Sequence, residues 1–428
     1  MSRRPMRVVP GEHLADLRPV REFLDEETRH SMRVVASVLP FKVNAYVVDE
    51  LIDWGRAPED PMFRLTFPHR DMLPSAAFDV MSDLLRRAAP RSVIRQEANR
   101  QRLRLNPHPG GQLELNVPPH DGAPVPGLQH KYRETVLLFP SAGQTCHAYC
   151  GYCFRWAQFV GMPELKQSLP SMRDAVVYLR QHTEVTDVLI TGGDPLIMST
   201  ARLREYVEPL LAEDLGHLRT IRIGTKALAY WPHRFLDDPD SDDLLRLFEQ
   251  CAAADRSVAL MTHFSHEREL ETVDVRAAIA RIRSAGVVLR AQAPMVRHVN
   301  DDPGVWARMW QRMVELGIHP YYCFVERDTG AQDYFALPLH RSLAIYQEAL
   351  RQVSGLARTA RGPVMSATPG KVVLHGESDV GGKKVFVCSF LQARDPEQVG
   401  RPFFAAWSPT ARWFDELEPA FPHLPFPA

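Results

Sequence analysis

The chain has 428 residues, 45% of them hydrophobic, so it can bury the core of a large barrel and accessory segments. Lys and Arg number 51 and Asp and Glu 52, a balance that gives no reason to expect nucleic acid or a membrane surface as a partner. Six cysteines in so long a chain do not make a disulfide framework, and no apolar run approaches the roughly 20 residues of a membrane span.

Residues 1–130 are expected to form a mainly helical N-terminal unit. No apolar segment follows the basic start, so we expect no signal peptide. Helices are predicted over Thr28–Leu39, Ala45–Ile52 and Ala76–Ala88, with an irregular connector over Arg56–Arg70, a short strand over Gln112–Val117 and a Pro- and Gly-rich linker over Pro118–Pro126.

From residue 131 to about 360, short apolar strands alternate with amphipathic helices. The predicted strands are Thr135–Phe139, Asp187–Thr191, Thr220–Gly224, Val258–His263, Val287–Ala293 and Pro320–Val325. The helices that follow them are Met172–His182, Ala201–Leu211, Ser241–Ala253, Val273–Ala285, Gly304–Glu315 and His340–Val353. This alternation predicts an α/β fold with a parallel sheet, and six units fit a partial (β/α)6 barrel better than a closed one of eight. The active site of such a fold lies at the carboxyl ends of the strands.

Residues 361–428 are expected to form a small C-terminal segment with β-structure. Strands are predicted over Lys371–Leu374 and Lys384–Phe390. The aromatic, Pro-rich tail from Phe403 is expected to pack on the outside or on a partner subunit.

Three cysteines follow the first barrel strand at the spacing C-x3-C-x2-C, namely Cys146, Cys150 and Cys153. Thiolates are soft ligands that suit iron–sulfur clusters and zinc. Three of them on a four-iron cluster leave one iron open to a small molecule, and this spacing is the signature of radical S-adenosylmethionine (SAM) enzymes. A closed zinc site would want four N or S ligands, and unrelated core thiols are the other alternative. An iron–sulfur cluster also requires a reducing compartment, so we expect a cytoplasmic protein.

Polar groups end the later strands, at the rim where such a site is expected. Gly192, Gly193 and Asp194 follow the second strand, where glycines allow a ligand close to the backbone, although Asp194 could simply cap the next helix. His263 ends the fourth strand and Gln292 lies near the end of the fifth. Both could instead be ordinary hydrogen-bonded residues of the rim or core.

Lys371 follows a Pro-Gly turn just before a strand. A lysine in that place can project into a cleft and form a Schiff base with pyridoxal phosphate, although most lysines after glycine lie on the surface. Lys383 and Lys384 also follow glycines and are the second choice.

Taken together, these motifs resemble the lysine 2,3-aminomutase family of radical SAM, pyridoxal-phosphate-dependent enzymes. The resemblance covers about 58–390 and adds further matches in order to those above: Asp60-Pro61, Leu65-Thr66-Phe67-Pro68-His69-Arg70, His130-Lys131-Tyr132, Arg222-Ile223-Gly224-Thr225, His263-Phe264-Ser265-His266, Val299-Asn300-Asp301 and Pro320-Tyr321-Tyr322. The reaction that it implies is movement of an α-amino group to the β-carbon of an amino acid.

The resemblance also implies roles for individual residues. The three cysteines would hold a [4Fe-4S] cluster, and SAM would lie against Gly192, Gly193, Asp194, His263 and Gln292. Lys371 would bind pyridoxal 5′-phosphate, and Lys131 takes the place of an arginine near its phosphate. Arg155 matches the arginine that binds the α-carboxylate of the substrate.

The chain departs from the lysine enzymes around the substrate. Their Asp-Ala-Pro and four glycines before the lysine are replaced by Met365-Ser366-Ala367-Thr368-Pro369-Gly370, and Arg327 stands where a second acid follows the sixth strand. Those two acids hold the distal ammonium of lysine, so we expect glutamate or another amino acid with an anionic or polar side chain. The alternatives are a lysine enzyme in which Glu326 or Asp328 holds the ammonium, and a non-catalytic binding protein on the same barrel.

The remaining expectations concern partners. The zinc-binding cysteines that the lysine enzymes carry near the C-terminus are missing after Cys388, so no zinc is expected. The family implies a reductant such as flavodoxin or ferredoxin, and we expect a homo-oligomer.

Overall fold

The computed structural model describes residues 5–120, 122–424 and 426–427. Its centre is a mixed sheet of eleven strands in the order β15-β14-β13-β12-β11-β10-β9-β8-β7-β6-β5. The strands of the parallel part are β6 (Thr135–Leu138), β7 (Asp187–Ile190), β8 (Thr220–Thr225), β9 (Ser257–His263), β10 (Val288–Met295), β11 (His319–Val325) and β12 (Arg361–Ser366). The protein is thus an α/β protein, as predicted, and its parallel strands follow one another in sequence order.

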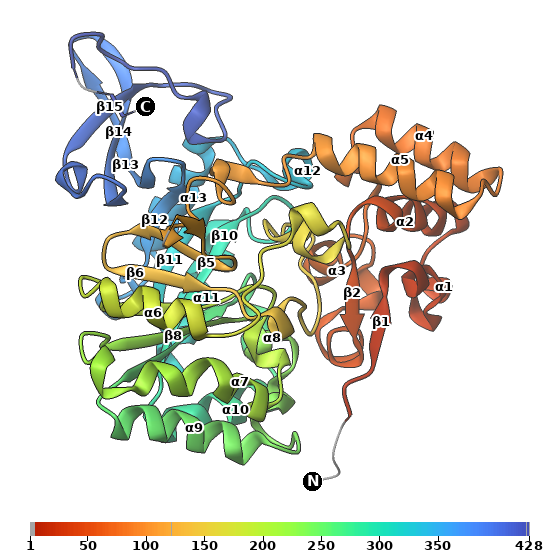
Figure 1. Ribbon diagram of the computed structural model, residues 1–428. Coiled ribbons are helices and arrows are strands. Elements are labelled where there is room, and N and C mark those ends of the chain that lie inside the picture. Colours follow the sequence, from red (N-terminus) through yellow and green to blue (C-terminus); the bar gives the residue numbers. More distant parts are fainter. Residues whose placement is uncertain (1–4, 121, 425, 428) are drawn as a thin grey trace.

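Helices follow the strands of the parallel part, and most of them cover its outer face (Figure 1). They are α6 (Arg173–Gln181), α7 (Thr200–Val207), α8 (Ala227–Tyr230), α9 (Ser241–Ala253), α10 (Val273–Ser284), α11 (Pro303–Glu315), α12 (Gln332–Phe335) and α13 (Leu339–Arg351). The six predicted strands and their helices are confirmed to within a few residues, and β12 adds a seventh parallel strand. Along β8, Ile221 and Ile223 are buried while Arg222 and Gly224 face the other side, the alternation of a strand packed against helices.

The N-terminal unit is mainly helical and lies to one side of the sheet (Figure 1). It contains α1 (Arg18–Phe23), α2 (Glu26–Val38), α3 (Pro61–Thr66), α4 (Ser75–Arg86), α5 (Arg91–Arg104), and the short pairs β1 (Val8–Pro10) with β2 (Lys42–Asn44) and β3 (Pro119–His120) with β4 (Ala123–Pro124). Two predictions were wrong here. The segment Gln112–Val117 forms turns rather than a strand, and the supposedly irregular connector contains α3.

The sheet continues past both ends of the predicted barrel. Strand β5 (Leu128–Tyr132) pairs antiparallel with β6, and β13 (Gly370–Val380) and β14 (Lys383–Ala393) form a hairpin longer than predicted. Strand β15 (Pro402–Ala406), part of the predicted tail, pairs with β14. The division at residues 130 and 360 and the partial-barrel shape stay predictions. In the described part of the chain, no helix is both long and apolar enough to cross a membrane.

Candidate active site

The cysteine loop leaves the carboxyl end of β6 and is fixed by the N-terminal unit. The backbone N–H of Tyr149 donates to the carbonyl of Lys42 at 2.8 Å, and that of Gly151 donates to the carbonyl of Leu65 at 2.7 Å. Gly151 lies so close to Phe335 that a Cβ there would be 3.0 Å from the ring. The resemblance motif around Leu65 therefore supports the loop and has no need of a chemical role of its own.

All three thiols of the loop are free and half-buried. Burial raises the pKa of each, that of Cys153 to about 12, and the neighbouring thiols act in the same direction on Cys146. Within the described residues, no three His, Cys, Asp or Glu side chains are grouped as a single metal ion needs. Three thiolates are the ligand set of a cluster that leaves one iron open, whereas a closed zinc site wants four N or S ligands.

The glycines after β7 pack against the segment that precedes Cys146. Gly192 has φ +144°, and a Cβ on it would lie 2.3 Å from the Nε2 atom of Gln144. A Cβ on Gly193 would lie 2.3 Å from the carbonyl oxygen of Thr145. Their absent side chains let the two loops touch, and the predicted contact of these glycines with SAM stays a prediction.

Asp194 is buried and bridges two strand ends. Its carboxylate accepts from the N–H of Leu196 at 3.0 Å, from the hydroxyl of Thr225 at 2.8 Å and from the N–H of Lys226 at 2.8 Å. Burial alone would raise its pKa, but His147 and these donors outweigh that effect and lower it. The capping alternative is thus realised, since Asp194 is the N-cap of the short helix Pro195–Ile197.

His263 and Gln292 meet at the carboxyl ends of β9 and β10. The two residues are in register, and the Nε2 atom of Gln292 lies 2.9 Å from the Nε2 atom of His263. Burial, with Lys226 nearby, lowers the pKa of His263 to about 3. The imidazole is therefore neutral at pH 7, and its Nε2 atom accepts a hydrogen bond from the side-chain amide of Gln292.

Lys371 is the second residue of β13, and its ammonium lies near two aromatic rings. Its Nζ donates to the Oε1 atom of Gln392 at 2.7 Å and lies 4.9 Å and 5.3 Å from the ring centres of Tyr322 and Tyr132. Burial, followed by the charge of Arg222, lowers its pKa to about 7. The alternative Lys384 is half exposed near the hairpin tip and pairs with Glu377 at 2.7 Å.

Lys131 and Arg155 approach the same region from β5 and from the cysteine loop. Lys131 donates to the carbonyl of Ala367, and its pKa is lowered to about 7 by burial and then by Arg327 and other cations. Arg155 lies over the rings of Phe139 and Phe154 at 4.5 Å and 4.7 Å. Its Nη1 atom is buried without a hydrogen-bond partner, and burial lowers its pKa to about 10.

Arg327 follows β11, and its side chain is 16% exposed. The Nε atom has no hydrogen-bond partner and lies 3.8 Å from Asp328, whose other carboxylate oxygen accepts from Asn106 at 3.0 Å. Arg327 acts electrostatically on both Lys131 and Arg155. We call Lys131, Arg155, Arg327 and Lys371 the cation cluster.

Sequence reasoning missed several neighbours of the cation cluster. Tyr132 and Tyr322 stand in quoted motifs and could have been suspected, but nothing local marks Gln392. Glu326, next to Arg327, is only 2% exposed, and burial raises its pKa well above the usual range, which favours the neutral acid. A cavity of about 660 Å³ lies elsewhere, between His147, Arg204, Trp231 and Asp240, and none of the predicted site residues lines it.

Comparison with known proteins decides the family. A protein of Aquifex aeolicus (strain VF5) named "Putative L-lysine 2,3-aminomutase" is 30% identical over 406 residues, which cover 95% of this chain and 94% of the relative. The chain belongs to the L-lysine 2,3-aminomutase family. It is therefore an enzyme, a radical SAM isomerase of the amino-acid 2,3-aminomutase type.

Two further aminomutases match over shorter stretches. The L-lysine 2,3-aminomutase of Clostridium subterminale is 30% identical over 268 residues, 62% of this chain and 60% of that protein. The L-lysine 2,3-aminomutase of Bacillus subtilis (strain 168) is 29% identical over 329 residues, 72% of this chain and 64% of that protein. No protein-family model matches the chain.

Solved structures with a similar trace include a radical SAM methyltransferase from Sphaerobacter thermophilus, with a TM-score of 0.37 and 15% identity over 55% of this chain and 68% of that one. Streptococcus suis SuiB bound to precursor peptide SuiA has a TM-score of 0.35 and 13% identity over 74% of this aminomutase-family chain and 67% of that one. Likeness of this degree adds nothing to the family assignment.

Proposed function

We propose that the protein is a radical SAM, pyridoxal-phosphate-dependent 2,3-aminomutase whose substrate carries a second carboxylate, as glutamate does. The observation that carries the substrate class is the cation cluster, in which, among the described residues, buried guanidinium nitrogens of Arg155 and Arg327 have no hydrogen-bond partner. Buried polar groups are normally hydrogen-bonded, so such nitrogens mark where an anionic ligand belongs.

The residues present fit the three cofactors that the family implies. Cys146, Cys150 and Cys153 would hold the cluster, and the strand ends with Asp194, His263 and Gln292 would hold SAM against Gly192 and Gly193. When bound, the cluster and SAM would supply a radical for hydrogen removal from the β-carbon, and pyridoxal phosphate would carry the migrating nitrogen.

Lys371 is the lysine best prepared to bind pyridoxal phosphate. A pKa of about 7 leaves about half of its side chains as the nucleophilic neutral amine at pH 7. The Oε1 atom of Gln392 accepts a hydrogen bond from the Lys371 amine and fixes the direction of that side chain. The ring faces of Tyr132 and Tyr322 shield the amine from water. Lys131, whose ammonium lies within electrostatic reach of Lys371, would face the cofactor phosphate.

Arg155 and Arg327 would then bind the two ends of the substrate. Arg155 would take the α-carboxylate and Arg327 the side-chain carboxylate, each through a planar fork that matches the anion. Phe154 lies beneath both guanidiniums, 4.7 Å and 5.8 Å from their centres, and spaces them apart. A substrate held at both ends presents its β-carbon in a fixed position, which is what hydrogen removal from one carbon requires.

Lysine is the competing substrate, because the named relatives are lysine 2,3-aminomutases. Its distal ammonium would need an unpaired carboxylate near Arg327. Burial raises the pKa of Glu326 well above its usual range, which favours its neutral form, and the two carboxylate oxygens of Asp328 lie 3.0 Å from Asn106 and 3.8 Å from Arg327. Neither is free to replace the acids that the lysine enzymes supply, so the surroundings of Arg327 favour an anion. The external reductant, the oligomeric state and the cytoplasmic location stay predictions.

The test is direct turnover. The protein is reconstituted anaerobically with iron, sulfide and pyridoxal phosphate, supplied with SAM and a chemical reductant, and offered glutamate, aspartate, glutamine and lysine separately. Mass spectrometry of derivatised products should find the β-amino isomer of glutamate as the main product. Rearrangement of lysine but not glutamate would overturn the substrate class and leave the aminomutase assignment standing.

A further inference from the structure

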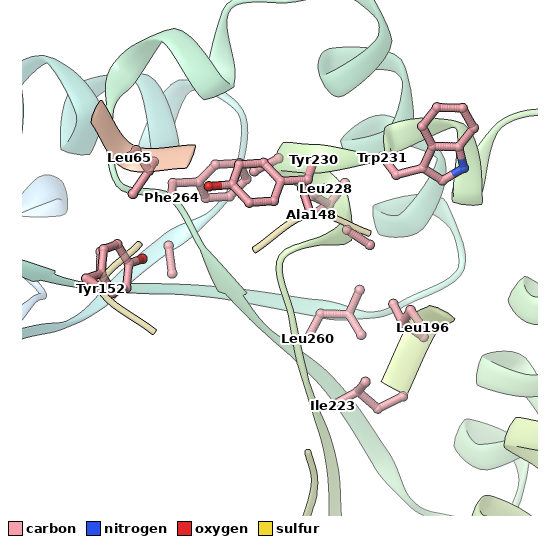
Figure 2. Packing of buried hydrophobic residues seen from close by; sticks show 14 of the residues in the cluster. Leu65, Ala148, Tyr152, Leu196, Ile223, Leu228, Tyr230, Trp231, Leu260 and Phe264 are labelled. Atoms are coloured by element: carbon pink, nitrogen blue, oxygen red, sulfur yellow. The ribbon is translucent and has the colours of Figure 1, made fainter. Parts of the chain in front are cut away.

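A phenol hydroxyl lies beside one of the three cysteine sulfurs. The hydroxyl oxygen of Tyr230, the last residue of α8, is 3.4 Å from the Sγ atom of Cys150. Tyr230 is 1% exposed and belongs, with Tyr152 and Phe264, to the buried cluster in Figure 2. A phenol hydroxyl is a hydrogen-bond donor, so at this distance it can donate a hydrogen bond to a thiolate.

Lys226, four residues earlier, brings a positive charge to the same sulfur. Its ammonium is 2.7 Å from the Oε1 atom of Glu269, donates to the carbonyl of His263 at 3.2 Å, and lies 4.6 Å from the ring centre of Tyr230. Its charge thus lies beside the tyrosine that contacts Cys150, and a nearby positive charge favours a thiolate. Lys226 therefore favours the charged form of this ligand.

Glu269 fixes that ammonium in place. Its carboxylate accepts backbone N–H groups from Ser265 at 2.5 Å and from His266 at 3.2 Å, and its side chain is fully buried. The motif His263-Phe264-Ser265-His266 and the end of β8 thus meet in a rigid hydrogen-bonded group behind Cys150.

We propose that Tyr230 and Lys226 are positioning residues that stabilise the Cys150 thiolate and raise the reduction potential of the cluster. The inference rests on the proposed cluster at Cys146, Cys150 and Cys153. One electron enters from a low-potential one-electron carrier, no bond forms or breaks, and the cluster gains one negative charge. Hydrogen bonds to the sulfur ligands and a nearby cation stabilise that extra charge, so they favour the reduced state.

The decisive variant is Tyr230→Phe, which removes one oxygen and leaves the ring in place. Its matched control is Tyr149→Phe. Tyr149 lies in the cysteine loop, and its hydroxyl forms a hydrogen bond with the Thr145 hydroxyl at 3.0 Å and not with a thiol. Both are reconstituted with the cluster, iron and sulfide are counted, and the midpoint potential is measured by redox titration followed by electron paramagnetic resonance. In Tyr230→Phe, reduction should become about tenfold less favourable, a fall of about 59 mV for one electron. The control should match the wild type.

A second pair of variants tests the charge independently. Lys226→Gln should lower the potential, and Lys226→Arg, which keeps the charge, should stay close to the wild type. If Tyr230→Phe holds a full cluster at the wild-type potential, the tyrosine has no such role, and an unchanged potential in Lys226→Gln excludes the lysine in the same way. A wild-type protein that binds no cluster would instead overturn the proposed function, so the two failures are distinguishable.

Discussion

The SAM side of the candidate site and the cation cluster are built on opposite principles. On the SAM side the polar groups are already paired: Asp194 bonds to Thr225, Gln292 to His263 and Lys226 to Glu269. Each partner comes from a neighbouring strand end or from the turn after one. The polar side chains of such a site are in place before a ligand binds, because each is held by a hydrogen bond or an ion pair with another.

In the cation cluster, by contrast, like charges face one another. The ammonium of Lys131 feels the charges of Arg327 and Lys371, and buried nitrogen atoms of Arg155 and Arg327 have no partner. This arrangement is unfavourable in the free protein and becomes favourable when anions enter. This difference suggests that the SAM side of the site serves the radical chemistry of the family, while the cation cluster determines which substrate binds.

The largest expected effect comes from the cysteine loop. In Cys150→Ala, two thiolates remain, and we expect loss of the brown chromophore, of SAM cleavage and of all aminomutase activity. Iron analysis and SAM cleavage after anaerobic reconstitution measure this. Cys251→Ala, a buried thiol of α9 outside the loop, should keep the full cluster. A Cys150→Ala protein with full iron content and activity would remove the loop from the site.

The cation cluster should be broken most strongly by reversing one charge. Arg327→Asp removes the partner of the side-chain carboxylate and places a like charge there. A buried pair of this kind is worth about 2–5 kcal/mol, so kcat/KM for glutamate should fall by about 30- to 5,000-fold. Arg327→Lys keeps the charge but loses the planar fork, so its kcat/KM for glutamate should lie between those of the wild type and Arg327→Asp. Unchanged glutamate turnover in Arg327→Asp would place the substrate carboxylate elsewhere.

The parts of the fold that the sequence predicted are those that leave a local pattern of buried and exposed residues. The strand–helix alternation predicted β6 to β11 closely, because burial on one face leaves a regular pattern. Helix α3 was missed because the prolines around it suggested a connector, although Asp60 before Pro61 is a helix start, its carboxylate accepting from Met62 at 3.0 Å. Gln112–Val117 alternates like a strand, but the backbone N–H groups of Glu114 and Leu115 donate to the carbonyl of Gly111 within turns instead of to a neighbouring strand.

The candidate site divides in the same way. The cysteines and the glycines after β7 are local motifs, visible without a structure. The partner of Lys371, Gln392, depends on the register of β13 with β14, and Lys131 reaches Ala367 across 236 residues of sequence. Such contacts are set by how strands line up in the sheet, which no local pattern encodes.

The pH dependence of cofactor capture tests the lowered pKa of Lys371. Only the neutral amine attacks an aldehyde, so the rate of pyridoxal phosphate capture by the apoprotein should rise with pH up to about 7 and then level off. An ordinary lysine, with a pKa of about 10.4, would show a rate that is still rising at pH 9. Stopped-flow absorbance measures the rate, and borohydride reduction followed by peptide mapping should place the label on Lys371. A label on Lys383 or Lys384 would move the cofactor to the exposed hairpin turn.

The smallest effect is expected on the paired side of the site. Gln292→Leu removes one neutral hydrogen bond to His263, whose imidazole is then free to turn. A bond of this kind is worth about 0.5–1.5 kcal/mol, so SAM should bind about 2- to 13-fold more weakly, as measured by equilibrium dialysis of the cluster-loaded protein. Gln311→Leu, the same change on the exposed face of α11, should bind SAM like the wild type. Because His263 is neutral with a pKa near 3, the loss should be the same at pH 6 and pH 8. A loss confined to pH 6 would show that the imidazole titrates there and that the paired side is not fixed before SAM binds.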